Sequence, residues 1–293
     1  YASSGSIKFK IGAKATNTQV VGTYTGTVNF YAVTNPEPLL TMQNVRRNDC
    51  TTTPSTVIDS RDGTEYHIAR LADDKCWMLD NLALDLLDTN ILNSLSSANT
   101  NIDPNDETNI LTSLKSGNRS TGNQYANGPI GDLTEGNSYS VARANLASKD
   151  IVPSDTISQT GGCKIGGYYN YCAASAGSYC YGNGTDAGTS SGDATSDICP
   201  KGWRMPTGNT DSEYQTLYTN YHSYYNYRTA LHLPLSGHFD SGSTVNQGSL
   251  GYFWSSARKN NYYNYYLDIN ANSVHLYSGA RYSGLSVRCL LNP

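Results

Sequence analysis

The chain has 293 residues, enough for one large domain or two unequal ones with a substantial core. Charged residues make up 15% of it and the net charge is −4, which argues against recognition driven by long-range attraction to nucleic acid or an anionic membrane. We therefore expect binding through shape, stacking and hydrogen bonds. The chain has 24 tyrosines against four phenylalanines, and tyrosine combines apolar area with a hydrogen-bonding tip. These tyrosines fit either an exposed contact surface or the rim of a β-rich core.

Seven cysteines without a Cys-x-x-Cys pair indicate disulfides rather than zinc or redox chemistry. Because disulfides persist in oxidising compartments, we expect an extracellular or cell-surface location. The sequence contains no apolar run long enough for a membrane-spanning helix, so we expect no span within this chain. No residue pattern calls for a metal or another cofactor.

The first 36 residues differ in pattern from the rest. Apolar and polar residues alternate over 6–13 and again over 22–33, which predicts two antiparallel strands. Two strands alone are marginal in water, so they must pack on something else. Residues 22–33 resemble the closing strand of bacterial immunoglobulin-like sandwich repeats. We expect residues 1–36 to be the terminal hairpin of such a sandwich, truncated here, with 35–38 as a linker.

From about residue 41 the sequence predicts a second, larger domain that extends to residue 293. A hairpin is expected around Asp62-Gly63, and residues 77–84 form a dense apolar cluster. Residues from about 85 to 160 are polar, and we expect them to be an insertion packed on the domain rather than part of its core. The helical positions within this insertion are Ile110, Leu111 and Leu114.

Thr210-Asp-Ser-Glu213 fits a capping box and predicts a helix over about 211–222. Short strands separated by Gly, Ser and Asn turns are then expected at 231–235, 252–254, 265–269 and 285–290.

Four segments, in this order and separation, resemble FISUMP-type domains of bacterial surface proteins, a branch of the C-type-lectin-like fold. They are residues 59–63 leading to 76–82, then 198–206, 251–256 and 284–289. The resemblance covers roughly residues 41–291. It implies an α+β, C-type-lectin-like fold, and by itself it does not identify a ligand.

The resemblance also implies structural roles for several residues. A disulfide between Cys199 and Cys289 would close the domain, and Cys50 with Cys76 is the second pairing we expect. Two of Cys163, Cys172 and Cys180 are expected to pair. The implied core residues are Trp77, Trp203, Trp254 and an internally paired Arg288.

A narrower resemblance concerns residues 258–283. Variable proteins of diversity-generating retroelements have C-type-lectin-like domains whose variable stretch lies between a Trp-Ser-Ser segment and a final Val-Arg strand. Mutated adenines in an AAC codon yield Asn, Tyr, Ser, Asp and His but never Lys, Glu, Gln, Met or Trp. Residues 260–283 are rich in the first group and contain none of the second.

This composition, rich in Tyr, Asn and Ser, is also the one that antibody loops favour. We expect Leu267, Ile269, Val274, Leu285 and Val287 to face inward. The candidate ligand-binding residues, expected on the outer face, are Tyr262, Tyr263, Tyr265, Asn270, Asn272, His275, Tyr277, Tyr282 and Ser283. The alternative is that 260–266 is a solvated polar hairpin.

No motif in the sequence indicates an enzyme. Gly188-Thr-Ser-Ser-Gly192 matches the nucleophile-elbow pattern but lacks a preceding apolar strand, and the five histidines are scattered. The tripeptides of calcium-dependent lectins and the C-terminal cysteine pair of sulfatase-activating oxidases are both missing. We therefore expect a surface module that binds protein or glycan on another cell or phage. The alternative is a structural appendage subunit that self-associates by strand addition through residues 1–34.

Overall fold

The computed structural model describes residues 22–23, 39–86, 88–115, 166–179, 192–209, 211–240, 243–246, 248–260, 263–270 and 272–293. The chain divides into two units, Tyr1–Pro38 and Leu39–Pro293. Only Gly22 and Thr23 of the first unit are described. The terminal strands predicted for residues 1–36, and most of the insertion predicted for 85–160, thus lie outside the described residues.

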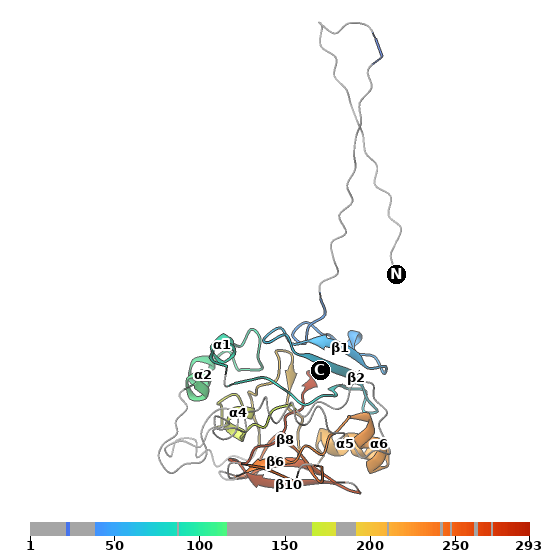
Figure 1. The fold of residues 1–293 in the computed structure, drawn as a ribbon, viewed down its shortest axis with the longest axis vertical. Helices are drawn as coiled ribbons and strands as arrows, with labels where there is room; N and C mark the ends of the chain where they lie inside the picture. Colours follow the sequence, from blue (N-terminus) through green and yellow to red (C-terminus); the bar gives the residue numbers. More distant parts are fainter. Residues whose placement is uncertain are drawn as a thin grey trace. The chain divides into compact units, whose positions relative to one another are not determined.

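The Leu39–Pro293 unit is an α+β fold (Figure 1). Its described strands are β1 (Ser55–Ile58), β2 (Glu65–Arg70), β3 (Cys76–Met78), β4 (Gly192–Asp193), β5 (Trp203–Arg204), β6 (His238–Asp240), β7 (Ser243–Val245), β8 (Gly251–Arg258), β9 (Tyr263–Ile269), β10 (Val274–Ala280) and β11 (Leu290–Leu291). Its described helices are the 3-10 turn η1 (Arg47–Asp49), α1 (Thr89–Ser94), α2 (Glu107–Lys115), α4 (Tyr171–Ala174), α5 (Glu213–Tyr221) and α6 (Tyr224–Ala230).

These strands form antiparallel sheets. One has five strands in the order β1-β2-β3-β11-β5, a second has four in the order β10-β9-β8-β4, and β6 and β7 form a pair of their own. The last strand, β11, lies between β3 and β5, so the end of the chain closes the five-stranded sheet. The hairpin predicted around Asp62-Gly63 is present, with β1 paired to β2 and Gly63 at a φ of +76°.

The five-stranded sheet carries a hydrophobic core on each face. Successive residues of one strand belong to different clusters, as Trp77 and Met78 do on β3 and Leu290 and Leu291 do on β11. This explains the consecutive apolar residues Trp77, Met78 and Leu79, because a strand buried on both faces has no polar side. Helices α5 and α6 contribute to the cluster that holds Trp77.

Both disulfides expected from the resemblance are present. Cys199 is bonded to Cys289, and Cys50 to Cys76, at sequence separations of 90 and 26. Cys172 is also disulfide-bonded, whereas Cys163 and Cys180 lie outside the described residues.

The three tryptophans and Arg288 are fully buried. Each indole N–H donates a hydrogen bond, that of Trp203 to Met42 O at 2.6 Å and that of Trp254 to Tyr169 O at 2.7 Å. Trp77 Nε1 donates to the carboxylate of Asp73 at 3.0 Å. These bonds satisfy the polar atom that each buried indole carries.

The predicted helix at 211–222 is present as α5, but its N-terminus differs from the prediction. Ser212 caps it by accepting from Gln215 N, so the capping residue is not Thr210. Glu213, expected to close a capping box, instead accepts hydrogen bonds from Arg204 and Lys75. Pairing with two cations satisfies this buried carboxylate better than one backbone N–H would.

Two further predictions of local structure were wrong. Residues 231–235 are not a strand: Leu231 ends α6, which the sequence analysis did not predict, and an irregular segment follows. The described part of the expected insertion also contributes to the core. Ile110 and Leu114 of α2 are buried in the hydrophobic cluster that holds Met78. Gly177 lets the chain after α4 approach α2, since a Cβ there would lie 2.4 Å from Ile110 O.

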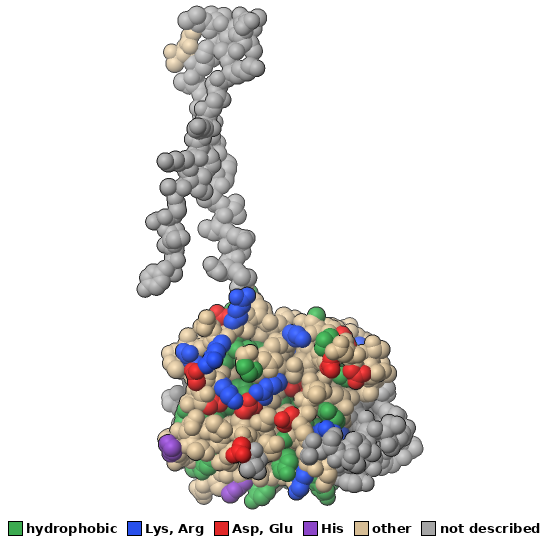
Figure 2. Space-filling model, turned by 180° about the vertical axis from the view of Figure 1, so that it is seen from behind, with side chains coloured by type: hydrophobic (Ala, Val, Ile, Leu, Met, Phe, Trp, Pro, Cys, Tyr) green, Lys and Arg blue, Asp and Glu red, His purple; other side chains and the backbone are tan. Residues whose placement is uncertain are grey.

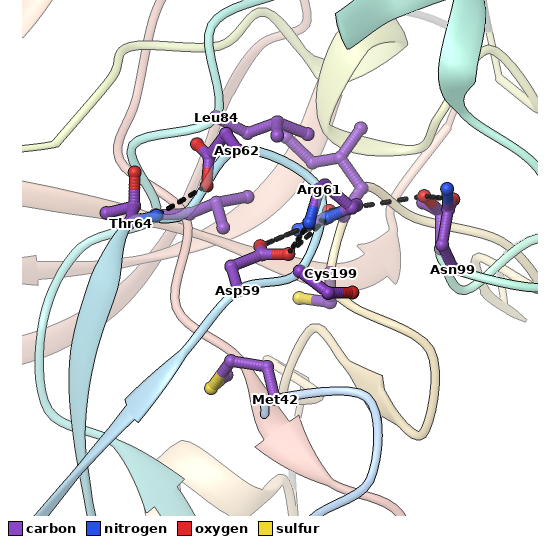
Figure 3. Close-up of polar contacts among 12 residues, drawn as sticks. Met42, Asp59, Arg61, Asp62, Thr64, Leu84, Asn99 and Cys199 are labelled. Carbon is purple, nitrogen blue, oxygen red and sulfur yellow. Dashed lines mark hydrogen bonds and ion pairs between the residues drawn. The ribbon is translucent and has the colours of Figure 1, made fainter. Parts of the chain in front are cut away.

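A buried ion pair anchors the turn between β1 and β2. The side chains of Asp59 and Arg61 are both inaccessible, and Arg61 Nη2 lies 2.6 Å from Asp59 Oδ2 (Figure 3). Arg61 Nη1 donates to Ile198 O at 2.8 Å, next to the Cys199 disulfide. The motif at 59–63 therefore ties this turn to the disulfide-bonded segment.

Candidate aromatic binding face

Strands β8, β9 and β10 carry most of the residues in which the sequence predicts a binding site. Figure 1 shows β10 along one margin of the Leu39–Pro293 unit, and β10 is the end strand of the four-stranded sheet. Val274 pairs with Ile269 and Ala280 with Tyr263, so β9 and β10 form a hairpin in unbroken register. On the other side of β9, Tyr252 pairs with Asp268, and the register shifts between Trp254 and Arg258.

The register determines which side chains share a face, because paired residues on neighbouring strands project to the same side. Leu267 pairs with Phe253 and Leu276, and Ile269 with Val274. These residues pack in or against the cluster that includes α5 and α6. We call this side of the sheet the core side, although Tyr252 and Tyr266 on the opposite side also pack against a cluster, the one that holds Trp254. Val274, expected inward, lies on the core side but is only half-buried.

The opposite side carries a row of aromatic rings. Tyr266 pairs with Tyr277 and with Trp254, and Asp268 pairs with His275 and with Tyr252. Ring centroids are 5.7 Å apart for Tyr252 and Tyr266, and 5.5 Å apart for His275 and Tyr277. We call the group formed by His238, Tyr252, Tyr266, Asp268, His275 and Tyr277 the aromatic face.

Neighbouring elements hold these rings in place. His238 on β6 contacts Tyr252 edge-on with centroids 4.8 Å apart, and buried Trp254 contacts Tyr266 at 6.1 Å. Gly279 leaves room for Tyr266, because a Cβ at position 279 would lie 2.7 Å from that ring. The half-buried rings are therefore fixed from beneath, whereas Tyr277 is 50% exposed at the margin.

Burial also affects the acidity of this face. It raises the pKa of Tyr266 to about 12, with Asp268 and two neighbouring tyrosines acting in the same direction. Burial raises the pKa of Asp268 as well, and His275 opposes that increase. The hydroxyl of Tyr266 consequently remains protonated at neutral pH and can donate a hydrogen bond.

The surface around β10 carries few charges. In Figure 2 most acidic and basic side chains lie on the upper and middle parts of the Leu39–Pro293 unit, while its lower margin shows mainly apolar, histidine and uncharged polar surface with a basic side chain among it. Of the seven residues of β10, none is Lys, Arg, Asp or Glu. The groups that this strand offers to a partner are ring faces, hydroxyls and backbone amides.

The structure leaves all the described candidate residues at least partly accessible, but it does not place them on one face. His275 and Tyr277 belong to the aromatic face, whereas Tyr263 and Tyr265 project to the core side with Leu267. Tyr263 is nevertheless 45% exposed, because it lies at the end of β9 farthest from Ile269, where the core side is open. The expectation of one common outer face was therefore wrong for these two tyrosines.

The other candidates lie in turns. Asn270 and Asn272 are in the β9–β10 turn, where Asn270 Oδ1 accepts from Asn272 N at 2.7 Å and from Ser273 N at 2.9 Å. Asn270 thus stabilises the turn, and Asn272 remains exposed. Tyr282 and Ser283 follow β10 and are half-buried, and Tyr262 lies outside the described residues.

The sequence analysis missed four members of the aromatic face, namely His238, Tyr252, Tyr266 and Asp268. A signal for two of them was available. Once Leu267 and Ile269 are placed inward, a period of two puts Tyr266 and Asp268 on the opposite side. His238 and Tyr252 come together only through the arrangement of β6 beside β8, which no local pattern encodes.

Within the described ranges, no group of three or more His, Cys, Asp or Glu side chains could hold a metal ion. No helix among the described residues is long and apolar enough to cross a membrane. Comparison of the chain with protein-family models, with curated proteins and with solved structures gives no match.

Proposed function

We propose that the chain is a secreted or surface-displayed module that binds a protein or glycan target through the aromatic face. The observation that carries this proposal is the row formed by Tyr252, Tyr266 and Tyr277, supported from beneath and open at the β10 margin. Aromatic residues are enriched at the cores of interfaces, and tyrosine supplies contact area with few rotatable bonds. The disulfides support an oxidising, extracellular location.

The resemblance to FISUMP-type, C-type-lectin-like domains is part of this proposal. Supporting it are the Cys199–Cys289 bridge, the buried tryptophans and the internal position of Arg288. Arg288 donates to Asn81 Oδ1 at 2.6 Å and to the carbonyls of Leu231 and His232. The residues that carry the resemblance thus hold the framework, and the aromatic face is built on that framework.

The binding proposal can be tested in two assays with the purified chain. In one, the labelled chain is applied to a glycan array; in the other, the chain is immobilised and the retention of whole bacterial cells is measured. We expect the double change His275→Ala and Tyr277→Ala to reduce retention at least tenfold, because both rings lie on the aromatic face. Tyr225→Ala is the matched control, since Tyr225 is 44% exposed on α6. Equal retention of the double variant, the control and the unmodified chain would reject the assignment.

We also propose that residues 258–283 are diversified by a retroelement. The support is their composition and their position between the Trp254 segment and the Arg288 segment. Sequencing the same locus from several isolates should show substitutions concentrated at Asn and Tyr positions of 258–283. Differences spread evenly along the chain would remove the diversification proposal and leave the binding proposal untouched.

A further inference from the structure

Strand β10 pairs only with β9 among the described strands, and no described residue forms a strand pairing with its other edge. The direction of its backbone groups follows from β8. Trp254 N donates to Ser286 O and Ser286 N donates to Tyr252 O, so the backbone groups of residues 252 and 254 point away from β9. Backbone groups alternate in direction along a strand. When this alternation is followed through the register, the backbone N–H and C=O groups of His275 and Tyr277 point toward β9. Those of Leu276 point outward, away from β9.

The outward row consists of the N–H and C=O groups of Val274, Leu276 and Ser278. It ends there because the next outward carbonyl, that of Ala280, accepts from Ser283 N at 3.1 Å. Natural edge strands are usually protected by charged side chains, proline, a bulge or short length. Over its seven residues β10 has regular register with β9, no proline and no charged side chain. Within the described residues, this edge therefore lacks the features that usually prevent strand addition.

We propose that β10 pairs antiparallel with β10 of a second copy of this chain, about a two-fold axis at Leu276. In this arrangement Leu276 is opposite Leu276 of the second copy, and Val274 is opposite Ser278. The pairing uses the three free residues on each copy and stops where the Ala280 carbonyl is occupied. An interface of this kind is isologous, the commonest geometry of homodimers.

A second copy fits this edge because the strand is self-complementary. On the aromatic face, His275 of one copy is opposite Tyr277 of the other, which places an imidazole against a phenol ring at each end of the seam. On the core side, leucine meets leucine at the axis. No two like charges meet, because the five residues of the seam, 274–278, carry no Lys, Arg, Asp or Glu.

Pairing would also join the two aromatic faces. His275 and Tyr277 lie on the same side of the sheet as Tyr266, so the rows of both copies become continuous across the seam. The dimer would present two equivalent binding faces side by side, which increases avidity for a repetitive cell surface. The pairing itself does not depend on any ligand, so it can be tested separately from the proposed binding function.

The first test is disulfide cross-linking of the full-length chain. Leu276→Cys places the two introduced thiols on the axis, where paired residues have Cα atoms about 5.5 Å apart, within reach of a disulfide. Val274→Cys is the matched control, since it is opposite Ser278 rather than itself. We expect mild oxidation to give covalent dimer for Leu276→Cys and only the unmodified chain's background for Val274→Cys. Equal dimer yields in the two variants would overturn the proposed register.

The second test separates the backbone from the side chain. Ser278→Pro removes one outward N–H from each copy but no bond to β9, whereas Ser278→Ala keeps the N–H and removes only the hydroxyl, which Lys259 Nζ contacts at 2.9 Å. Sedimentation velocity over a concentration series should show a dimer dissociation constant about tenfold higher for Ser278→Pro than for Ser278→Ala. A monomer at all concentrations, or a dimer equally stable in both variants, would overturn the pairing. A monomeric result would mean that, if any strand pairs with the β10 edge, it comes from another protein.

Discussion

The framework, by which we mean the buried residues in and around the motif segments 59–63, 76–82, 198–206 and 284–289, differs from the aromatic face in how it uses polar groups. In the framework, buried charges are satisfied within the chain: Asp59 pairs with Arg61, and Arg288 donates to an amide oxygen and three carbonyls. On the aromatic face, Tyr277 and His275 are exposed and their rings contact each other. The first region uses its hydrogen-bonding capacity to fix the fold, whereas under the proposed function the second keeps that capacity for a partner.

This contrast explains why the recognisable sequence motifs give little information about the ligand. Burying a charge requires a specific partner at a specific place, so the framework residues are constrained by each other. An exposed ring on a supported strand can be replaced with little cost to folding. Changes in the framework should therefore reduce stability, whereas changes to the exposed rings of His275 and Tyr277 should leave stability nearly unchanged and, under the proposed function, reduce binding.

The largest loss of stability is expected from removing the Cys199–Cys289 bridge. The double change Cys199→Ala and Cys289→Ala opens a loop of 90 residues and should lower the free energy of unfolding by about 4 to 5 kcal/mol. The corresponding change at Cys50 and Cys76 opens a loop of 26 residues and should cost about 3.5 kcal/mol. Urea denaturation of the full-length chain measures both, and a larger cost for the shorter loop would contradict the prediction.

A loss of about 3 to 5 kcal/mol is expected for Arg61→Met, because it leaves the carboxylate of Asp59 buried without a counter-charge. Burial by itself raises the pKa of Asp59, and the charge and hydrogen bonds of Arg61 bring it below the usual value. Arg47→Met is the control, since Arg47 pairs with Asp74 at an exposed site. That change should cost less than about 1 kcal/mol. Similar costs for the two variants would show that the buried pair has no special role.

How far the sequence predicts these two regions depends on where the determining contacts lie. The hairpin at Asp62-Gly63 follows from local turn chemistry, and the disulfides and buried tryptophans follow from ordered motifs. Helix α6 was missed because its tyrosines gave no clear apolar period, although Ser223 caps it by accepting from Asn226 N. The aromatic face was predicted only in part, because exposure was inferred from residue type. The face on which a side chain lies depends instead on strand register, which the bulge between Trp254 and Arg258 also affects.

The pH dependence of stability should report the buried carboxylate of Asp197, whose ionised form is destabilised by burial. Burial raises the pKa of Asp197 to about 6, although Met205 N, Cys199 N and Asn101 donate to it. The folded state then binds the proton more tightly than the unfolded state. The stabilisation from Asp197 is fully present below about pH 4 and is lost as the pH rises through about 6, a change of about 3 kcal/mol.

Several other groups change in the opposite direction, among them His232, Glu213 and Asp59, so the measurement is a difference between variants. Burial, and then Arg288, lower the pKa of His232 to about 4, which removes stability as the pH falls below 6.5. Burial raises the pKa of Glu213, but Arg204 and Lys75 outweigh it and bring the value to about 2, so its contribution is lost only below about pH 4.5. We expect the stability of the unmodified chain minus that of Asp197→Asn to decrease between pH 4 and pH 7. A constant difference would contradict the prediction.

The smallest effect on stability is expected on the aromatic face. Because His275 and Tyr277 are exposed, the double change to alanine should alter the free energy of unfolding by less than about 0.5 kcal/mol. Tyr266→Ala is the informative contrast on the same face, since its half-buried ring contacts Trp254 and Tyr252 and lies against Gly279. That change should cost about 2 to 3 kcal/mol. Thermal denaturation of both variants measures the two stability costs and so distinguishes the supporting ring from the exposed rings. If the exposed pair proved as costly as Tyr266, these rings would belong to the framework, and the division between a region that folds and a region that binds would fail.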